Sequence, residues 1–147
     1  MTEDHRLSKV EILIQQNKFA EAEKILSDLL TADSNNIHFL SLLAEVNLQQ
    51  DKFDKASNII DNAIGLSPDT SYLFFMKSRI AIQQDSLSEA EKNISQAIEL
   101  DPYEADYFAL LANIKLSRKQ FEEALESADQ ALEIDAENLL ALNTRST

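Results

Sequence analysis

This chain of 147 residues contains no cysteine, no tryptophan, one glycine and two prolines. Without cysteine it cannot form a disulfide, a cysteine-ligated zinc site or a cysteine nucleophile. A loop that cradles a phosphate needs several glycines close together, because only glycine lets the backbone turn sharply and approach a pyrophosphate. Gly65 stands alone, so these absences exclude the common nucleotide-binding and zinc-binding motifs.

Basic side chains and long apolar runs are also scarce. The chain has 13 Lys and Arg against 26 Asp and Glu, a net charge of −13 without any basic block, so no nucleic acid partner is expected. Apolar runs such as 72–76 and 139–142 are far below the roughly 20 residues that cross a bilayer. The polar, acidic first residues offer no apolar stretch for a signal peptide, and a cytoplasmic location is therefore expected.

The residues that are present favour a helical domain. Hydrophobic residues make up 44% of the chain and charged residues 27%, a composition typical of folded proteins. Leu, Ile, Ala, Glu, Gln and Lys are abundant, and all but Ile are strong helix formers. The expected fold is all-α, in a single domain over residues 1–147.

A repeat of 34 residues runs through the chain. Phe19-Ala20-Glu21-Ala22 is followed at 34-residue intervals by similar segments at 53–56, 87–90 and 121–124. The repeats span 3–36, 37–70, 71–104 and 105–138. Each is interpreted as two helices, for example 37–49 and 53–66, because apolar residues recur at helical spacing on one face. Residues 139–147 start a fifth repeat without its second helix, so we expect a fragment of a longer protein.

Small side chains recur at two places in every repeat. The eighth and twentieth places hold Val10, Ala44, Ser78 and Ala112, and Ala22, Ala56, Ala90 and Ala124. Two helices approach closely only where small side chains meet, and larger residues then fill the space against the next repeat. Together with Pro68 and Pro102 in the thirty-second place, this pattern resembles the tetratricopeptide repeat (TPR) over essentially the whole chain.

The resemblance implies a right-handed superhelical solenoid of antiparallel helix hairpins. In that family the first helices line a concave groove that holds peptides or partner helices. The corresponding groove residues in this sequence are Leu7, Glu11, Ile14 and Gln15 in the first repeat, His38, Glu45, Leu48 and Gln49 in the second, Tyr72, Phe75, Arg79, Ile82 and Gln83 in the third, and Asn113 and Leu116 in the fourth.

Two features of this predicted groove allow alternative interpretations. Ile14, Leu48, Ile82 and Leu116 form an apolar row that either contacts a partner beside the glutamines or packs into the solenoid. Tyr72 and Phe75 lie one turn apart and are aromatic anchors of the kind that dominate interfaces, with Arg79 one turn further on for a partner carboxylate or carbonyl. Alternatively, Phe75 packs between repeats and Arg79 pairs with Glu45.

The expected partner is a protein or peptide, neutral or basic, with apolar anchors. One TPR subclass grips the acidic carboxyl terminus of chaperones with Lys, Asn, Asn, Lys and Arg at fixed places. Those places hold Leu7, Glu11, Leu42, Tyr72 and Met76 when counted from the first repeat, and Ser41, Glu45, Met76, Asp106 and Leu110 from the second. Because the cations are missing, a chaperone acidic tail is not expected to bind.

No pattern predicts catalysis, a cofactor or a metal site. The carboxylates at the starts of second helices complement the helix dipole, and Asp51 with Lys55 is expected to form a surface ion pair. His5 and His38 do not make the closely spaced set that a metal needs. The expected function is a protein-binding scaffold without catalysis. Self-association into homo-oligomers, through the groove or the unfinished repeat at 139–147, is the alternative.

Overall fold

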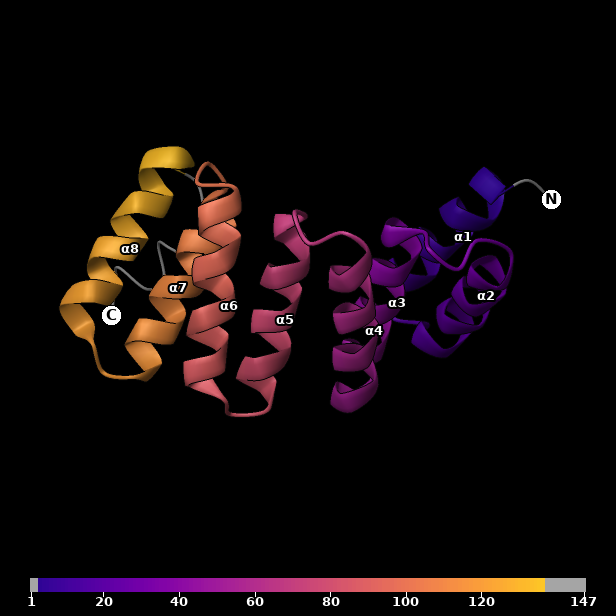
Figure 1. The fold of residues 1–147 in the computed structure, drawn as a ribbon, viewed down its shortest axis with the longest axis horizontal. Helices are drawn as coiled ribbons and strands as arrows, with labels where there is room; N and C mark the ends of the chain where they lie inside the picture. The colour runs from indigo at the N-terminus through magenta and orange to yellow at the C-terminus, as the bar shows by residue number, and fades with distance from the viewer. Residues whose placement is uncertain (1–2, 137–147) are drawn as a thin grey trace. The chain divides into compact units, whose positions relative to one another are not determined.

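In a computed structural model that describes residues 3–136, the chain forms eight α-helices. They are α1 (Glu3–Gln15), α2 (Phe19–Ala32), α3 (Ile37–Gln49), α4 (Phe53–Leu66), α5 (Ser71–Gln83), α6 (Leu87–Leu100), α7 (Ala105–Ser117) and α8 (Phe121–Ile134) (Figure 1). The all-α prediction is confirmed, and the helices predicted at 37–49 and 53–66 are α3 and α4. The predicted start of a fifth repeat lies outside the described residues.

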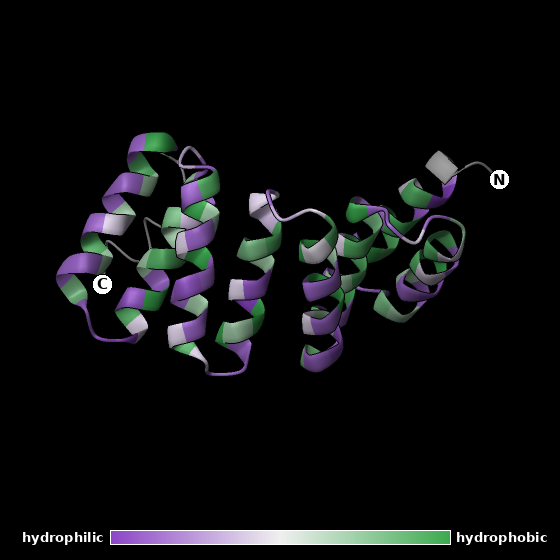
Figure 2. Cartoon of the chain, viewed as in Figure 1, coloured by the Kyte–Doolittle hydropathy of each residue, from purple (hydrophilic) through white to green (hydrophobic). Residues whose placement is uncertain are grey.

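The chain divides into two compact units, unit 1 (Met1–Pro68) with α1–α4 and unit 2 (Asp69–Thr147) with α5–α8. Each unit contains two of the predicted hairpins, and the single domain over the whole chain stays a prediction. In Figure 2, purple and green residues alternate along α6 and α8, so each has a hydrophilic and a hydrophobic face. Over the described ranges, every helix is too short or too polar to cross a membrane.

The same backbone turn closes every hairpin. The residue that follows the first helix by two positions has a positive φ in each case: Asn17 (59°), Asp51 (60°), Asp85 (57°) and Lys119 (63°). In the first turn, the Lys18 amide donates to the Leu13 carbonyl at 2.8 Å and the Asn17 amide donates to Ile14 at 3.0 Å. This pair of bonds defines a Schellman motif. Asn and Asp tolerate this conformation better than other side chains, which explains three of the four residues.

Small residues bring the two helices of each hairpin together. Every residue at the eighth and twentieth places of the repeat is at most 2% exposed. In unit 2 the Ser78 hydroxyl on α5 donates a hydrogen bond of 2.7 Å to the Ala90 carbonyl on α6, so the backbones lie close at this point. A larger side chain at either place would push the helices apart.

The cores of the two units use equivalent positions. Leu26, Phe39 and Val46 in unit 1 correspond to Ile94, Tyr107 and Ile114 in unit 2, each separated by two repeats of 34 residues. In both cases the core joins one hairpin to the first helix of the next. A third cluster of Ala109, Ala112, Ala128 and Ala131 packs α7 against α8. Within each unit, the first helix of the second repeat is therefore fixed by its own hairpin and by the preceding one.

Replacing Ala90 by Leu tests the close contact between α5 and α6. Ala90 is fully buried against Ser78, so the added atoms should overpack this contact and lower the free energy of unfolding by about 1–3 kcal/mol. Chemical denaturation followed by circular dichroism measures the change. Ser95→Leu, on the exposed side of the same helix, is the matched control. A midpoint for Ala90→Leu equal to that of the parent would contradict the assignment.

Candidate functional site

Three aromatic rings from α5 and α7 lie in contact on one side of unit 2. The Phe75 ring centroid is 5.8 Å from that of Tyr72 and 5.2 Å from that of Tyr107. Tyr72 is 42% exposed, whereas Tyr107 is 4% exposed and belongs to the core. The row thus runs from the surface into the interior. It offers an aromatic anchor whose position is set by buried neighbours.

A hydrogen bond holds the buried end of this row. The Tyr107 and Ser71 hydroxyl oxygens are 3.0 Å apart, which joins the start of α5 to the start of α7. Burial raises the pKa of the Tyr107 phenol above its ordinary value, and the hydrogen bond with Ser71 opposes that effect. Tyr107 is therefore a neutral hydroxyl at physiological pH, and its role is structural.

Arg79 adds a positive charge beside the rings. Its guanidinium carbon lies 5.8 Å from the Phe75 ring centroid, within cation–π distance, and its Nη1 is 3.5 Å from the Met76 sulfur. Arginine remains protonated at any physiological pH and presents N–H donors suited to carboxylates and carbonyls. Tyr72, Phe75, Tyr107 and Arg79 together form what we call the aromatic–arginine cluster.

A small hollow of about 150 Å³ lies at the other end of the same two helices. It is lined by Ile82 from α5, Leu87 from α6, and Asn113, Ile114 and Ser117 from α7. Because the rings of Phe75 and Tyr107 meet near the start of α5 and α7, and Ile82 and Ile114 meet near their ends, the two helices run side by side in the same direction. We call this surface, from the cluster to the hollow, the α5–α7 face.

Unit 2 thus brings together most of its predicted site residues. Tyr72, Phe75 and Arg79 meet in the cluster, while Ile82 and Asn113 line the hollow. Gln83 is exposed and Leu116 is half-buried. Phe75 and Ile82 also pack against the core of the unit, so they are only partly available to a partner. Sequence reasoning missed Tyr107 and Leu87, because both stand at places that face a neighbouring helix and give no groove signal.

The predicted groove residues of unit 1 differ from those of unit 2 in their burial. Leu7 and Ile14 pack against the core, and Leu48 is only 6% exposed, which corrects its assignment to an open groove. The polar residues remain accessible. Four of them are exposed, namely Glu11, Gln15, His38 and Gln49, and Glu45 is half-buried. Most residues of the apolar row predicted from the sequence therefore pack inside the units. Spacing along a helix does not separate a groove residue from one beside it in the core.

Two carboxylates at equivalent places of the repeat form ion pairs with basic side chains of the following repeat. Glu23 on α2 accepts hydrogen bonds from Lys55 at 2.8 Å and Lys52 at 3.2 Å. The predicted pairing of Lys55 with Asp51 is therefore replaced by a contact across repeats. The hydrogen bond from Lys55 is the main cause that lowers the pKa of Glu23 below its ordinary value of 4.5, although burial opposes it.

The second of these carboxylates is Glu91 on α6. It lies 3.1 Å from Lys115 and 3.3 Å from Arg118, both from the next repeat. Lys115 also pairs with Glu123 at 2.8 Å, and that contact is the largest cause that raises the pKa of Lys115. These carboxylates join repeats within a unit.

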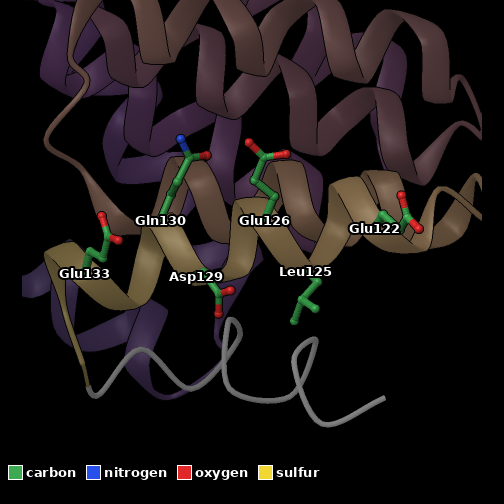
Figure 3. Close-up of a pocket in the computed structure, with 6 residues that line it drawn as sticks. All are labelled: Glu122, Leu125, Glu126, Asp129, Gln130 and Glu133. Carbon is green, nitrogen blue, oxygen red and sulfur yellow. The ribbon is translucent and has the colours of Figure 1, made fainter.

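An open hollow of about 480 Å³ lies along α8 (Figure 3). It is lined by Glu122, Leu125, Glu126, Asp129, Gln130 and Glu133, and Figure 3 shows Leu125 and Asp129 pointing away from Glu126 and Gln130. All but Asp129 are exposed, so these side chains form an acidic surface of α8. Across residues 5–136, no three His, Cys, Asp or Glu side chains gather as a metal site would require.

Comparison with known proteins agrees with the repeat pattern. Two family models of the tetratricopeptide repeat match the sequence, one over residues 13–80 and the other over residues 75–138. No curated protein sequence matches the chain.

Similar solved structures are TPR proteins. TTC0263, a thermophilic TPR protein in Thermus thermophilus, has a TM-score of 0.85 and 17% identity, over 93% of this chain and 76% of its own. YrrB, a TPR protein with an unusual peptide-binding site, has a TM-score of 0.79 and 21% identity, over 97% and 73%. The first TPR of Spaghetti (RPAP3), bound to the HSP90 peptide SRMEEVD, has a TM-score of 0.71 and 17% identity, over 75% and 87%. At these identities the likeness concerns the fold.

Replacing Glu23 by Gln tests the charge network of unit 1. A carboxyl group whose pKa is lowered by folding stabilises the protein above its unfolded pKa and loses that contribution as the pH falls through the lowered value. We expect Glu23→Gln to lower the free energy of unfolding by about 0.5–1 kcal/mol at pH 7, because the two lysines are partly exposed, and by nothing measurable near pH 2.

Urea denaturation at both pH values measures the effect. Glu126→Gln, at an exposed position in the middle of α8 where the helix dipole has little effect, is the control and should change stability at neither pH. An equal loss for Glu23→Gln at both pH values would mean that the side chain acts through packing and not through its charge.

Proposed function

Because this chain belongs to the tetratricopeptide repeat family, we propose that it is a protein-interaction scaffold that binds a partner peptide or helix on the α5–α7 face, without catalysis. The observation that carries this proposal is the aromatic–arginine cluster. Solved TPR proteins of similar fold include YrrB, which has a peptide-binding site, and RPAP3, which is bound to a peptide. The general role of an interaction scaffold follows from this family membership.

The cluster combines the properties of an interface anchor. Tyr72 supplies exposed aromatic area, and its contact with Phe75 restricts its motion, so that binding costs less side-chain entropy. The Arg79 guanidinium lies over the Phe75 ring and supplies a cation that can donate hydrogen bonds. Tyr, Trp and Arg are the residue types most enriched at the energetic centres of interfaces. A partner would bring an apolar side chain to Tyr72 and Phe75 and a carbonyl or carboxylate to Arg79.

The first helices of unit 1 offer polar groups of their own. Gln15, His38 and Gln49 are accessible on α1 and α3, and the Gln49 amide nitrogen lies 3.4 Å from the Glu45 carboxylate. Such side chains both donate and accept hydrogen bonds and suit a peptide backbone. The net charge of −13 favours a neutral or basic partner over an acidic one. Self-association is the alternative, supported by the exposed apolar Phe121 and Leu125 on α8.

Affinity capture with the immobilised chain tests the proposal. We expect Tyr72→Ala to reduce the recovery of a specific partner at least about tenfold, because losing an anchor costs about 1.4 kcal/mol or more. Tyr103→Ala is the matched control, since Tyr103 is 82% exposed in the turn before α7 and lies outside the cluster. Equal recovery of the partner with both variants would mean that the site lies elsewhere. Recovery of this chain itself would favour self-association.

An acidic chaperone tail should not bind. At the five places that grip such tails, this chain carries Glu11, Glu45 and Asp106 among uncharged residues. Like charges would repel the tail, and no lysine is available at these places to replace them. Isothermal calorimetry with the peptide SRMEEVD should therefore detect no heat of binding. Micromolar affinity for this peptide would contradict the assigned partner chemistry.

A further inference from the structure

The hollow at the ends of α5 and α7 has an apolar interior and a polar rim. Ile114 is 1% exposed and forms the floor, and Ile82 and Leu87 are half-buried and form the walls. Asn113 is half-buried and Ser117 is exposed. A long side chain that is apolar along its stem and polar at its tip matches this distribution.

The volume limits the occupant to one side chain. An apolar cavity of about 150 Å³ accommodates a group the size of benzene, whereas sites for drug-sized molecules measure about 300–1,000 Å³. The hollow of about 150 Å³ is therefore too small for a metabolite or a nucleotide. It is large enough for the side chain of one residue of a bound peptide.

The polar atoms at the rim are available to such a residue. Within residues 5–136, the side chains of Asn113 and Ser117 make no hydrogen bond to the protein. By contrast, the Asn47 amide nitrogen donates to the Leu43 carbonyl at 2.8 Å, and the Asn93 amide nitrogen donates to the Glu89 carbonyl at 2.9 Å. The Asn113 carbonyl oxygen and the Ser117 hydroxyl can therefore accept hydrogen bonds from a ligand.

The electrostatic surroundings favour a cation at this rim. α5 ends at Gln83 and α7 ends at Ser117, and the carboxyl ends of helices carry partial negative charge that stabilises positive groups. The nearby cations Lys115 and Arg118 are engaged by Glu91 and Glu123. Beyond the helix ends, the negative charge of Asp85 and the positive charge of Lys119 cancel. Over residues 69–136 as a whole, acidic residues outnumber basic ones. The rim therefore attracts a positive tip.

We propose that the hollow binds one lysine side chain of the partner, a specificity that rests on the function proposed above for the α5–α7 face. The lysine stem lies against Ile82 and Leu87, and its ammonium donates to Asn113 Oδ1 and Ser117 Oγ. Arginine fits less well, because its planar guanidinium is matched by a bidentate acceptor such as a carboxylate. Seven residues of α5 separate Phe75 from Ile82, a rise of about 10 Å. In an extended peptide the lysine therefore lies about three residues from the group at the cluster.

Nuclear magnetic resonance of the isotopically labelled chain tests this assignment with two small probes. N-acetyl-lysine methylamide carries the ammonium, and N-acetyl-norleucine methylamide has the same stem without it. We expect the lysine probe to shift the Ile82 methyl and Asn113 side-chain amide signals saturably, and to bind at least about fivefold tighter than the norleucine probe, because a charge-assisted hydrogen bond is the difference. Weaker or equal binding of the lysine probe would overturn the proposal.

Two variants show whether the preference arises at the rim. Asn113→Leu should bind both probes with similar affinity, whereas Asn62→Leu, at an exposed position of α4, should keep the preference for lysine. An unchanged preference in Asn113→Leu would also overturn the proposal. The probes do not reach Tyr72, so failure here leaves capture through the aromatic–arginine cluster intact, and failure of that capture leaves the probe result intact.

Discussion

The close approach of the two helices in each hairpin is the constraint on which the rest of this structure depends. It requires small side chains at the eighth and twentieth places, and in unit 2 it brings the Ser78 hydroxyl to 2.7 Å from the Ala90 carbonyl. Once each second helix lies against its first helix, large residues such as Leu26 and Ile94 extend to the following repeat and form the core there. Within each unit the two first helices are thereby held side by side, as α5 and α7 are.

The charges reinforce this arrangement at the same intervals. Glu23 and Glu91 stand at equivalent places two repeats apart, and each binds cations from the repeat that follows it. Lys115 is thereby kept away from the α5–α7 face, which leaves Arg79 as the basic residue of the cluster. The chain is strongly acidic overall, yet the carboxylates of Glu23 and Glu91 support the packing of one repeat against the next. Partner recognition then depends on a few aromatic and polar side chains.

Much of the fold was predictable from the sequence because the repeat fixes both helix bounds and close contacts. The bounds of α3 and α4 follow from the apolar periodicity, and the small residues at Ala56 and Ala90 mark where helices cross. Side-chain contacts between repeats were less predictable, because they depend on how far neighbouring hairpins are rotated. Lys55 reaches Glu23 and not Asp51 for this reason, and Leu48 is buried although its spacing matches a groove residue.

The function proposed for this chain requires a partner on the α5–α7 face, next to Tyr72. A photo-reactive benzoyl-phenylalanine placed at Tyr72 tests it most directly, because it forms a covalent bond only with a molecule in contact. Tyr103, which is more exposed but lies in the turn between α6 and α7, is the comparison position. We expect a captured partner to be cross-linked from position 72 and not from position 103. Cross-linking from 103 alone, or equally from both positions, would contradict it.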